Sequence, residues 1–158
     1  KRYCFRRYPR RCEMEESIND FIKNQLGIKK VNPMNYSPLS LAYMGDTVYD
    51  TIIKTIIVSQ HNMQANKYHK KVTALVKAEA QAKMITKIEH LLTQEEEDIY
   101  KRGRNAKSYT SAKNASMIDY RMATGFEALI GYLYLKEDYH RLTELVKVAL
   151  DITETTNE

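Results

Sequence analysis

Two segments of the chain, residues 38–59 and 119–135, are apolar on nearly every side when they are read at helical spacing. A helix without a polar face has to be surrounded by other elements, so both are expected at the centre of a domain. Alternation of the kind that marks strands is scarce, and the chain has only five glycines. The sequence therefore predicts an all-α fold of about six or seven helices.

Shorter helices are expected around this central pair. Thr93 and Glu96 form a capping box that begins one of them, and Gly103 ends it. Ser37 is a suitable N-cap for the first central helix, because Pro38 follows it at the first helical position. The other helices are predicted over residues 15–26, 64–91 (as one helix or two) and 138–152, with connectors at 28–37 and 103–116.

The net charge of +5 comes from residues 1–13, which hold six basic residues and one acid, whereas residues 14–158 are electrically balanced. This first segment has no clear periodicity. We interpret it as a basic extension, non-native or disordered, with Met14 as the natural start and residues 14–158 as one domain. An RNA-binding arm is the alternative. Both cysteines, Cys4 and Cys12, lie in this segment and do not suffice for a zinc site.

Asp46 and Glu127 are the candidate catalytic and metal-binding residues, because each interrupts an apolar run. A carboxylate near a core is costly unless it is paired, hydrogen-bonded or bound to a metal. Gly131 shares a helix face with Glu127 and would let another helix approach closely, so that both acids could enter one pocket. A bound Mg²⁺ would offset their repulsion and could activate water for attack on a phosphodiester. The alternative is structural, with each acid satisfied by backbone, Arg or Tyr groups.

Two basic segments are candidate RNA-binding sites. Residues 101–113 hold five positive side chains and no acid, and residues 66–71 open a helix with three lysines. Such segments suit phosphate contacts, which make binding sensitive to salt. A solvated helix face is the alternative, above all for residues 66–71. The candidate RNA-binding residues are Lys67, His69, Arg102, Arg104, Asn105, Lys107 and Lys113.

The acidic run from Glu95 to Asp98 has two interpretations. It could hold a metal in an all-α nucleotide pyrophosphohydrolase. A negatively charged first helical turn, which complements the helix dipole, explains it better.

Two motifs resemble the ribonuclease III family. Residues 41–50, Leu-Ala-Tyr-Met-Gly-Asp-Thr-Val-Tyr-Asp, resemble its signature helix, and residues 124–135 resemble its second catalytic helix. Residues 102–107, Arg-Gly-Arg-Asn-Ala-Lys, narrow the resemblance to Mini-ribonuclease III, the bacterial form without a double-stranded-RNA-binding domain. The similarity covers about residues 33–150.

The resemblance implies a homodimer with an RNA-binding valley between its protomers. It implies cleavage of double-stranded RNA with Mg²⁺, or with Mn²⁺ as a substitute, in which Asp46 and Glu127 bind the metal. The implied substrate is the 23S ribosomal RNA precursor, with a ribosomal protein as a further partner. A cytoplasmic protein without membrane association is expected, because neither a signal peptide nor a membrane-spanning stretch is visible.

The chain departs from ordinary ribonuclease III domains at three acidic positions. Leu39 and Ala42 replace two glutamates, and Thr124 replaces an aspartate. These replacements leave the number of metals open. They also motivate an alternative function, a non-catalytic module for RNA binding or ribosome assembly.

Overall fold

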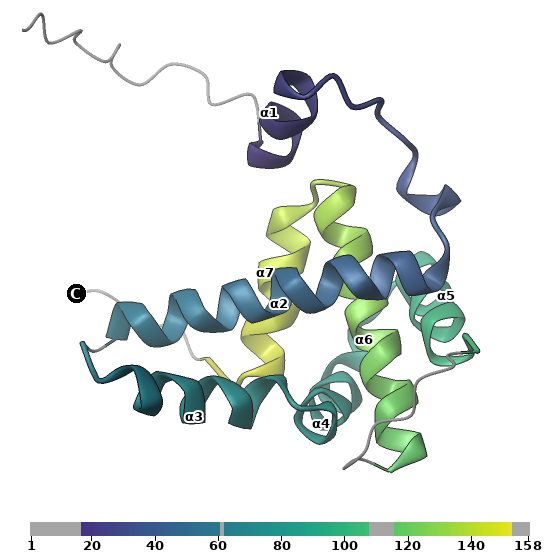
Figure 1. The fold of residues 1–158 in the computed structure, drawn as a ribbon. Coiled ribbons are helices and arrows are strands. Elements are labelled where there is room, and N and C mark those ends of the chain that lie inside the picture. Colours follow the sequence, from purple (N-terminus) through teal and green to yellow (C-terminus); the bar gives the residue numbers. More distant parts are fainter. Residues whose placement is uncertain (1–16, 61, 108–115, 153–158) are drawn as a thin grey trace, which may run out of the picture. The chain divides into compact units, whose positions relative to one another are not determined.

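In a computed structural model of the chain, residues 17–60, 62–107 and 116–152 are described, and every regular element among them is helical (Figure 1). The elements are α1 (Ile18–Gln25), η1 (Pro33–Asn35), α2 (Pro38–Gln60), α3 (Ala65–Val76), α4 (Ala78–Ile88), η2 (Glu89–Leu91), α5 (Gln94–Arg104), α6 (Met117–Leu135) and α7 (Tyr139–Ala149), where η denotes a 3₁₀ helix. The predicted all-α fold is confirmed. The expectations for residues 1–13 and for Lys113 lie outside the described residues.

The chain divides into two compact units, Lys1–Val31 and Asn32–Glu158. In the first unit, the Ser17 hydroxyl caps α1 by accepting a hydrogen bond from the Asp20 amide (3.0 Å). The helix ends before Gly27, whose φ of +64° is a conformation that glycine adopts without strain. The second unit holds the remaining elements and every residue discussed below.

Helices α2 and α6 cross at the centre of the second unit (Figure 1). Every residue of α6 from Ala123 to Leu133 is buried except Glu127, so this helix is surrounded as its composition predicted. Tyr49 of α2 meets Phe126 of α6 edge to face, with ring centroids 5.1 Å apart. The two apolar segments of the sequence therefore do form the central layer of the core.

The segment 64–91 forms two helices, α3 and α4, because the Lys77 backbone between them is extended (φ −66°, ψ 150°). Val72, Met84 and Ile88 lie at helical spacing and are buried, whereas Leu91, which continues the same spacing, is exposed. It lies in η2, whose tighter turn carries it away from the stripe that α-helical spacing defines.

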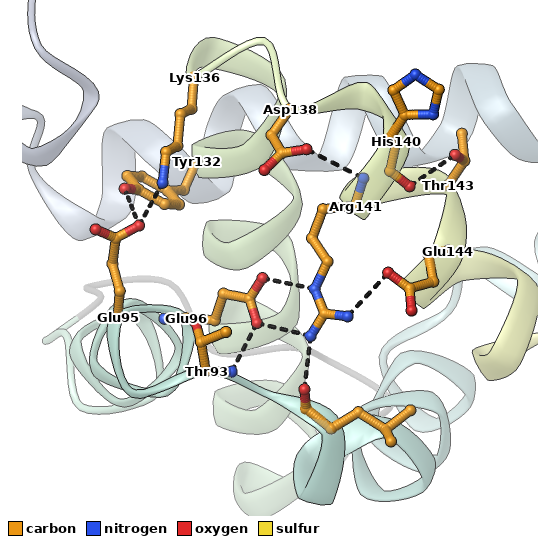
Figure 2. Close-up of polar contacts among 11 residues, drawn as sticks. Thr93, Glu95, Glu96, Tyr132, Lys136, Asp138, His140, Arg141, Thr143 and Glu144 are labelled. Atoms are coloured by element: carbon orange, nitrogen blue, oxygen red, sulfur yellow. Dashed lines mark hydrogen bonds and ion pairs between the residues drawn. The ribbon is translucent and has the colours of Figure 1, made fainter.

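A polar network joins α5 to α6 and α7 (Figure 2). Arg141 donates from Nε and Nη2 to the two carboxylate oxygens of Glu96, at 2.8 and 3.0 Å. Glu96 also accepts from the Thr93 amide and completes the predicted capping box. Glu95 accepts hydrogen bonds from Tyr132 on α6 and from Lys136, the residue that follows this helix.

The acidic run at the start of α5 is thus occupied by structural partners. Glu97 pairs with Lys101, and Asp98 accepts from Gln94. Burial raises the pKa of Glu96, but the hydrogen bonds from Arg141 and Thr93 outweigh it, and the net pKa lies below the usual value. These contacts favour the interpretation of a charged first turn over that of a metal-binding cluster.

Candidate active site

Two glycines allow α2 and α6 to touch through their backbones. A Cβ atom placed on Gly45 would lie 1.7 Å from the carbonyl oxygen of Glu127. A Cβ on Gly131 would lie 2.0 Å from the carbonyl oxygen of Leu41. No side chain fits at either position without moving one of the helices. The close approach that Gly131 predicted is confirmed, and Gly45 is its counterpart on the other helix.

This crossing brings Asp46 and Glu127 into one site, because Asp46 follows Gly45 and Glu127 supplies the carbonyl at the contact. Burial raises the pKa of Glu127 to about 7, and the negative charge of Asp46 adds to the shift. The pKa of Asp46 is also raised, first by desolvation and then by Asp50. The two carboxyl groups are therefore close enough for the charge of Asp46 to oppose the ionisation of Glu127.

The two acids differ in their exposure. Glu127 is half-buried, as expected of an acid in an apolar helix, but Asp46 is exposed. The expectation that Asp46 lies in a buried segment is wrong for its side chain, because α2 turns the Leu39, Tyr43 and Asp46 side of the helix away from the core of this chain. The site is consequently open to solvent on the side of Asp46.

Gln81 of α4 completes the surroundings of Glu127. Its side chain is fully buried and lies beside the Glu127 carboxyl, where its amide favours the ionised form. Even so, neither amide atom of Gln81 has a hydrogen-bond partner of good geometry among the described residues. We did not expect a site residue on α4. A signal existed, because Gln81 interrupts the inner stripe that contains Met84, Ile85 and Ile88.

The donors of this site fit a hard divalent cation. Mg²⁺ and Mn²⁺ favour carboxylate oxygens, and Mg²⁺ is commonly held by one or two carboxylates while it keeps several waters. Within the described ranges, no group of three or more His, Cys, Asp or Glu side chains could hold a metal. The Thr124 hydroxyl donates to the Tyr120 carbonyl (2.9 Å), so it is already engaged. A cation here would have Asp46 and Glu127 as its carboxylate ligands.

The C-terminal end of α5 packs beside this site. A Cβ on Gly103 would lie 2.6 Å from that of Ala128 and 3.0 Å from the Thr124 carbonyl, so α5 is anchored on the turn of α6 that carries Glu127. Arg102, Arg104, Asn105 and Lys107 are exposed around this anchor. Arg102 donates to the Tyr36 carbonyl oxygen at 3.2 Å, which fixes the direction of its side chain. The end of α5 that carries these four predicted RNA-binding residues thus packs on the turn of α6 that includes Glu127.

The other basic segment lies elsewhere. Lys67 and His69 are exposed on α3, and α3 and the end of α5 lie on opposite sides of α6 (Figure 1). Lys67 lines a surface hollow with Met63, Lys70 and Lys71, whereas His69 lines another beside Asp50 and Lys54. Asp50 is ion-paired with Lys54 at 2.6 Å. In the part of the chain that the structure describes, the two basic segments are therefore carried by helices on different sides of α6.

Comparison with known proteins identifies the class of this domain. The family model described as ribonuclease III domain matches residues 39–138, which include both helices of the crossing. A crystal structure of a protein from Fusobacterium nucleatum has the same fold, with a TM-score of 0.68 and 28% sequence identity, and the match covers 74% of this chain and 93% of that chain.

Curated relatives narrow the class. The Mini-ribonuclease 3 of Thermoanaerobacter sp. is 44% identical over 141 residues, covering 89% of this chain and 99% of the relative. That of Clostridium tetani is 47% identical over 139 residues, covering 87% and 91%. The chain belongs to the ribonuclease III family and, within it, to the Mini-ribonuclease III group. It is therefore an endoribonuclease, of a family that generally uses a divalent metal ion.

Over the part of the chain that the structure describes, no helix combines the length and the apolar character needed to cross a bilayer.

Proposed function

We propose that this chain is a Mg²⁺-dependent endonuclease that cleaves double-stranded RNA, with Asp46 and Glu127 as its metal ligands and catalytic residues. The observation that supports the proposal is the backbone contact of α2 and α6 at Gly45, together with the effect of the Asp46 charge on the pKa of Glu127. Neither acid is consumed by an ion pair in the described residues, in contrast to Asp50 and the acids of α5.

The chemistry divides between the cation and the protein. A bound Mg²⁺ would supply a water molecule of lowered pKa and would stabilise charge on the phosphodiester. Asp46 and Glu127 would hold that cation at the crossing, and Mn²⁺ would serve as a substitute because it accepts the same oxygen ligands. Glu127 is ionised when the cation is present, since a positive charge reverses the effect of burial on its pKa.

RNA binding is proposed for the basic side chains. Arg102, Arg104, Asn105 and Lys107 are exposed at the end of α5 that packs on the turn of α6 carrying Glu127, which supports a role for them in holding phosphates of the duplex. Lys67 and His69 on α3 would contact a more distant part of the duplex. Lys113 is included in this group on its sequence context alone.

A homodimer is part of the proposal. Tyr43 is 82% exposed and Leu39 is 39% exposed, and the two lie one turn apart on α2. Exposed apolar side chains of this size, next to Asp46, mark a surface that another protein surface would cover. A second copy there would set its own acidic pair near the first and form a valley for the RNA between the protomers.

The cellular role is proposed from the resemblance and from the named relatives. The substrate would be the 23S ribosomal RNA precursor in the cytoplasm, where a ribosomal protein could present it.

A cleavage assay tests the proposed activity. Purified protein is mixed with a labelled RNA duplex, with and without Mg²⁺, and the products are resolved on a denaturing gel. Asp46→Asn and Glu127→Gln should each lower the cleavage rate at least about a hundredfold while duplex binding, measured by gel shift, persists. Asp50→Asn is the matched control, because Asp50 lies one turn from Asp46 and pairs with Lys54. Cleavage at the wild-type rate in either of the first two variants would remove that residue from the site.

A further inference from the structure

Gln81 has a buried side-chain amide whose polar atoms are not satisfied by the described residues around it. Its side chain is 0% exposed, and both Nε2 and Oε1 lack a hydrogen-bond partner within the described residues. Buried amides are nearly always paired, since an unpaired one gives up its bonds to water without replacement. An apolar residue of the same size would fill this position of α4 at lower cost. The unpaired amide therefore indicates that a further polar group is present when the site holds its cation.

The neighbour of this amide is the Glu127 carboxyl. Helix α4 packs directly on α6, and the interaction of Gln81 with Glu127 favours the ionised carboxylate. The two side chains nevertheless stop short of a hydrogen bond of good geometry. A small rotation of the Glu127 carboxylate, of the kind that ligation imposes, would complete it.

The other end of the amide needs a donor. A glutamine presents both an NH₂ group and a carbonyl oxygen, and the ionised carboxylates of Asp46 and Glu127 can only accept. Water is then the remaining donor in the site, and a cation that keeps part of its hydration shell brings water with it. The amide matches such a site at both ends.

We propose that Gln81 is a positioning residue of the cleavage site, whose Nε2 group holds the Glu127 carboxylate in its metal-binding orientation while Oε1 accepts a hydrogen bond from a water molecule of the loaded site. This inference rests on the proposed metal-dependent function. It adds a third residue, from α4, to the site that α2 and α6 form.

Two variants of α4 test the role. Gln81→Met keeps the volume of the side chain and removes its polar atoms. Ile85→Val is the matched control, because Ile85 is equally buried one turn further along the same helix and has no polar role. The melting temperature of each protein is measured by differential scanning fluorimetry, first with EDTA and then over a titration with Mn²⁺. Cleavage of an RNA duplex is measured over the same range of Mn²⁺ concentrations.

Gln81→Met should melt at the same temperature as the wild type or higher without metal, because it removes an unpaired buried amide. The Mn²⁺ midpoint, which is the Mn²⁺ concentration that gives half of the full effect, should rise about ten- to hundredfold in both the melting and the cleavage titration. Ile85→Val should melt lower and keep the wild-type midpoint. An unchanged midpoint in Gln81→Met would overturn the proposal. If that variant does not fold, Gln81→Asn, which keeps the amide but withdraws it by one methylene, is titrated instead and judged by the same midpoint.

The wild-type protein separates this proposal from the proposed function. Suppose that the wild-type protein cleaves the duplex and Glu127→Gln does not. A Gln81→Met protein with the wild-type Mn²⁺ midpoint would then disprove the role of Gln81 and leave the proposed function intact. If wild-type protein does not cleave, the proposed function fails, and the Mn²⁺ melting titration still decides whether Gln81 supports a cation site.

Discussion

At the scale of single residues, Glu127 is the acid of this site whose ionisation is most unfavourable without a cation. It is the one residue of α6 between Ala123 and Leu133 that is not buried, and the charge of Asp46 raises its pKa. Burial and the neighbouring charge both oppose ionisation. A divalent cation removes both penalties, so metal binding and the stability of the domain should be coupled at this residue.

The first prediction concerns the stability of Glu127→Gln without metal. The pKa of Glu127 is raised from 4.5 to about 7 in the folded chain, so the wild type loses stability as the pH rises through this interval and the unfolded state releases its proton first. Above pH 7 the cost reaches at most about 3 kcal/mol. With EDTA at pH 8, Glu127→Gln should be the more stable protein by up to this amount in urea unfolding.

The difference should shrink below about pH 5, where the folded and unfolded wild type both hold the proton. Added Mg²⁺ at pH 8 should stabilise the wild type and leave Glu127→Gln unchanged. A variant that is less stable than the wild type at pH 8 in EDTA would contradict the view that this carboxylate is costly without a cation.

At the scale of elements, the crossing of α2 and α6 determines where the acids lie. The sequence was sufficient to predict both central helices and the small residue at their contact, because an apolar circumference and a glycine at helical spacing are local signals. It could not predict that Asp46 is exposed, since the same apolar pattern arises whether a helix is covered by its own chain or by another. Tyr43 and Leu39 are exposed on that side of α2.

Gln81 shows the complementary limit of sequence analysis. It stands on the inner stripe of α4, where a polar residue is unusual, yet its spacing does not reveal which group it meets. Its neighbour Glu127 lies 46 positions further along the chain, on a different helix. Contacts between helices depend on how they pack, and the pattern within one helix does not contain that information.

The second prediction concerns Gly131. A methyl group at this position would lie 2.0 Å from the Leu41 carbonyl oxygen, so Gly131→Ala must push α2 and α6 apart. We expect a loss of about 1–3 kcal/mol or more in the free energy of unfolding, together with a loss of cleavage that exceeds the unfolded fraction. Thr51→Ala, an exposed position of α2, is the control and should change stability by less than about 0.5 kcal/mol. Wild-type activity in a well-folded Gly131→Ala protein would show that cleavage does not depend on the close contact of α2 and α6.

At the scale of the whole molecule, the proposed dimer would bring together surfaces that lie apart on one chain. The basic end of α5 packs on the turn of α6 that carries Glu127, whereas α3 lies on the other side of α6 (Figure 1). A two-fold pairing would repeat each feature, and an apolar surface beside Asp46 is where such a pairing would join two acidic sites. The proposed dimer therefore accounts for both the exposed apolar residues and the divided positive charge.

The last prediction tests this pairing through Tyr43→Glu. Tyr43 is 82% exposed in the single chain, so its replacement should leave the fold of the protomer intact. In a two-fold interface the new carboxylate is buried twice, which should weaken the dimer by about 3 kcal/mol or more, a change of over a hundredfold in its dissociation constant. Light scattering after size exclusion should show a dimer for the wild type and a monomer for the variant at the same micromolar concentration.

Val58→Glu is the control, because Val58 is 57% exposed near the other end of α2, away from Asp46. It should remain dimeric. Cleavage by Tyr43→Glu should fall in parallel with the dimer fraction and recover in part when the protein is concentrated, because assembly rather than chemistry is impaired. A Tyr43→Glu protein that stays dimeric, or a monomer that cleaves at the wild-type rate, would place the interface elsewhere or make it dispensable.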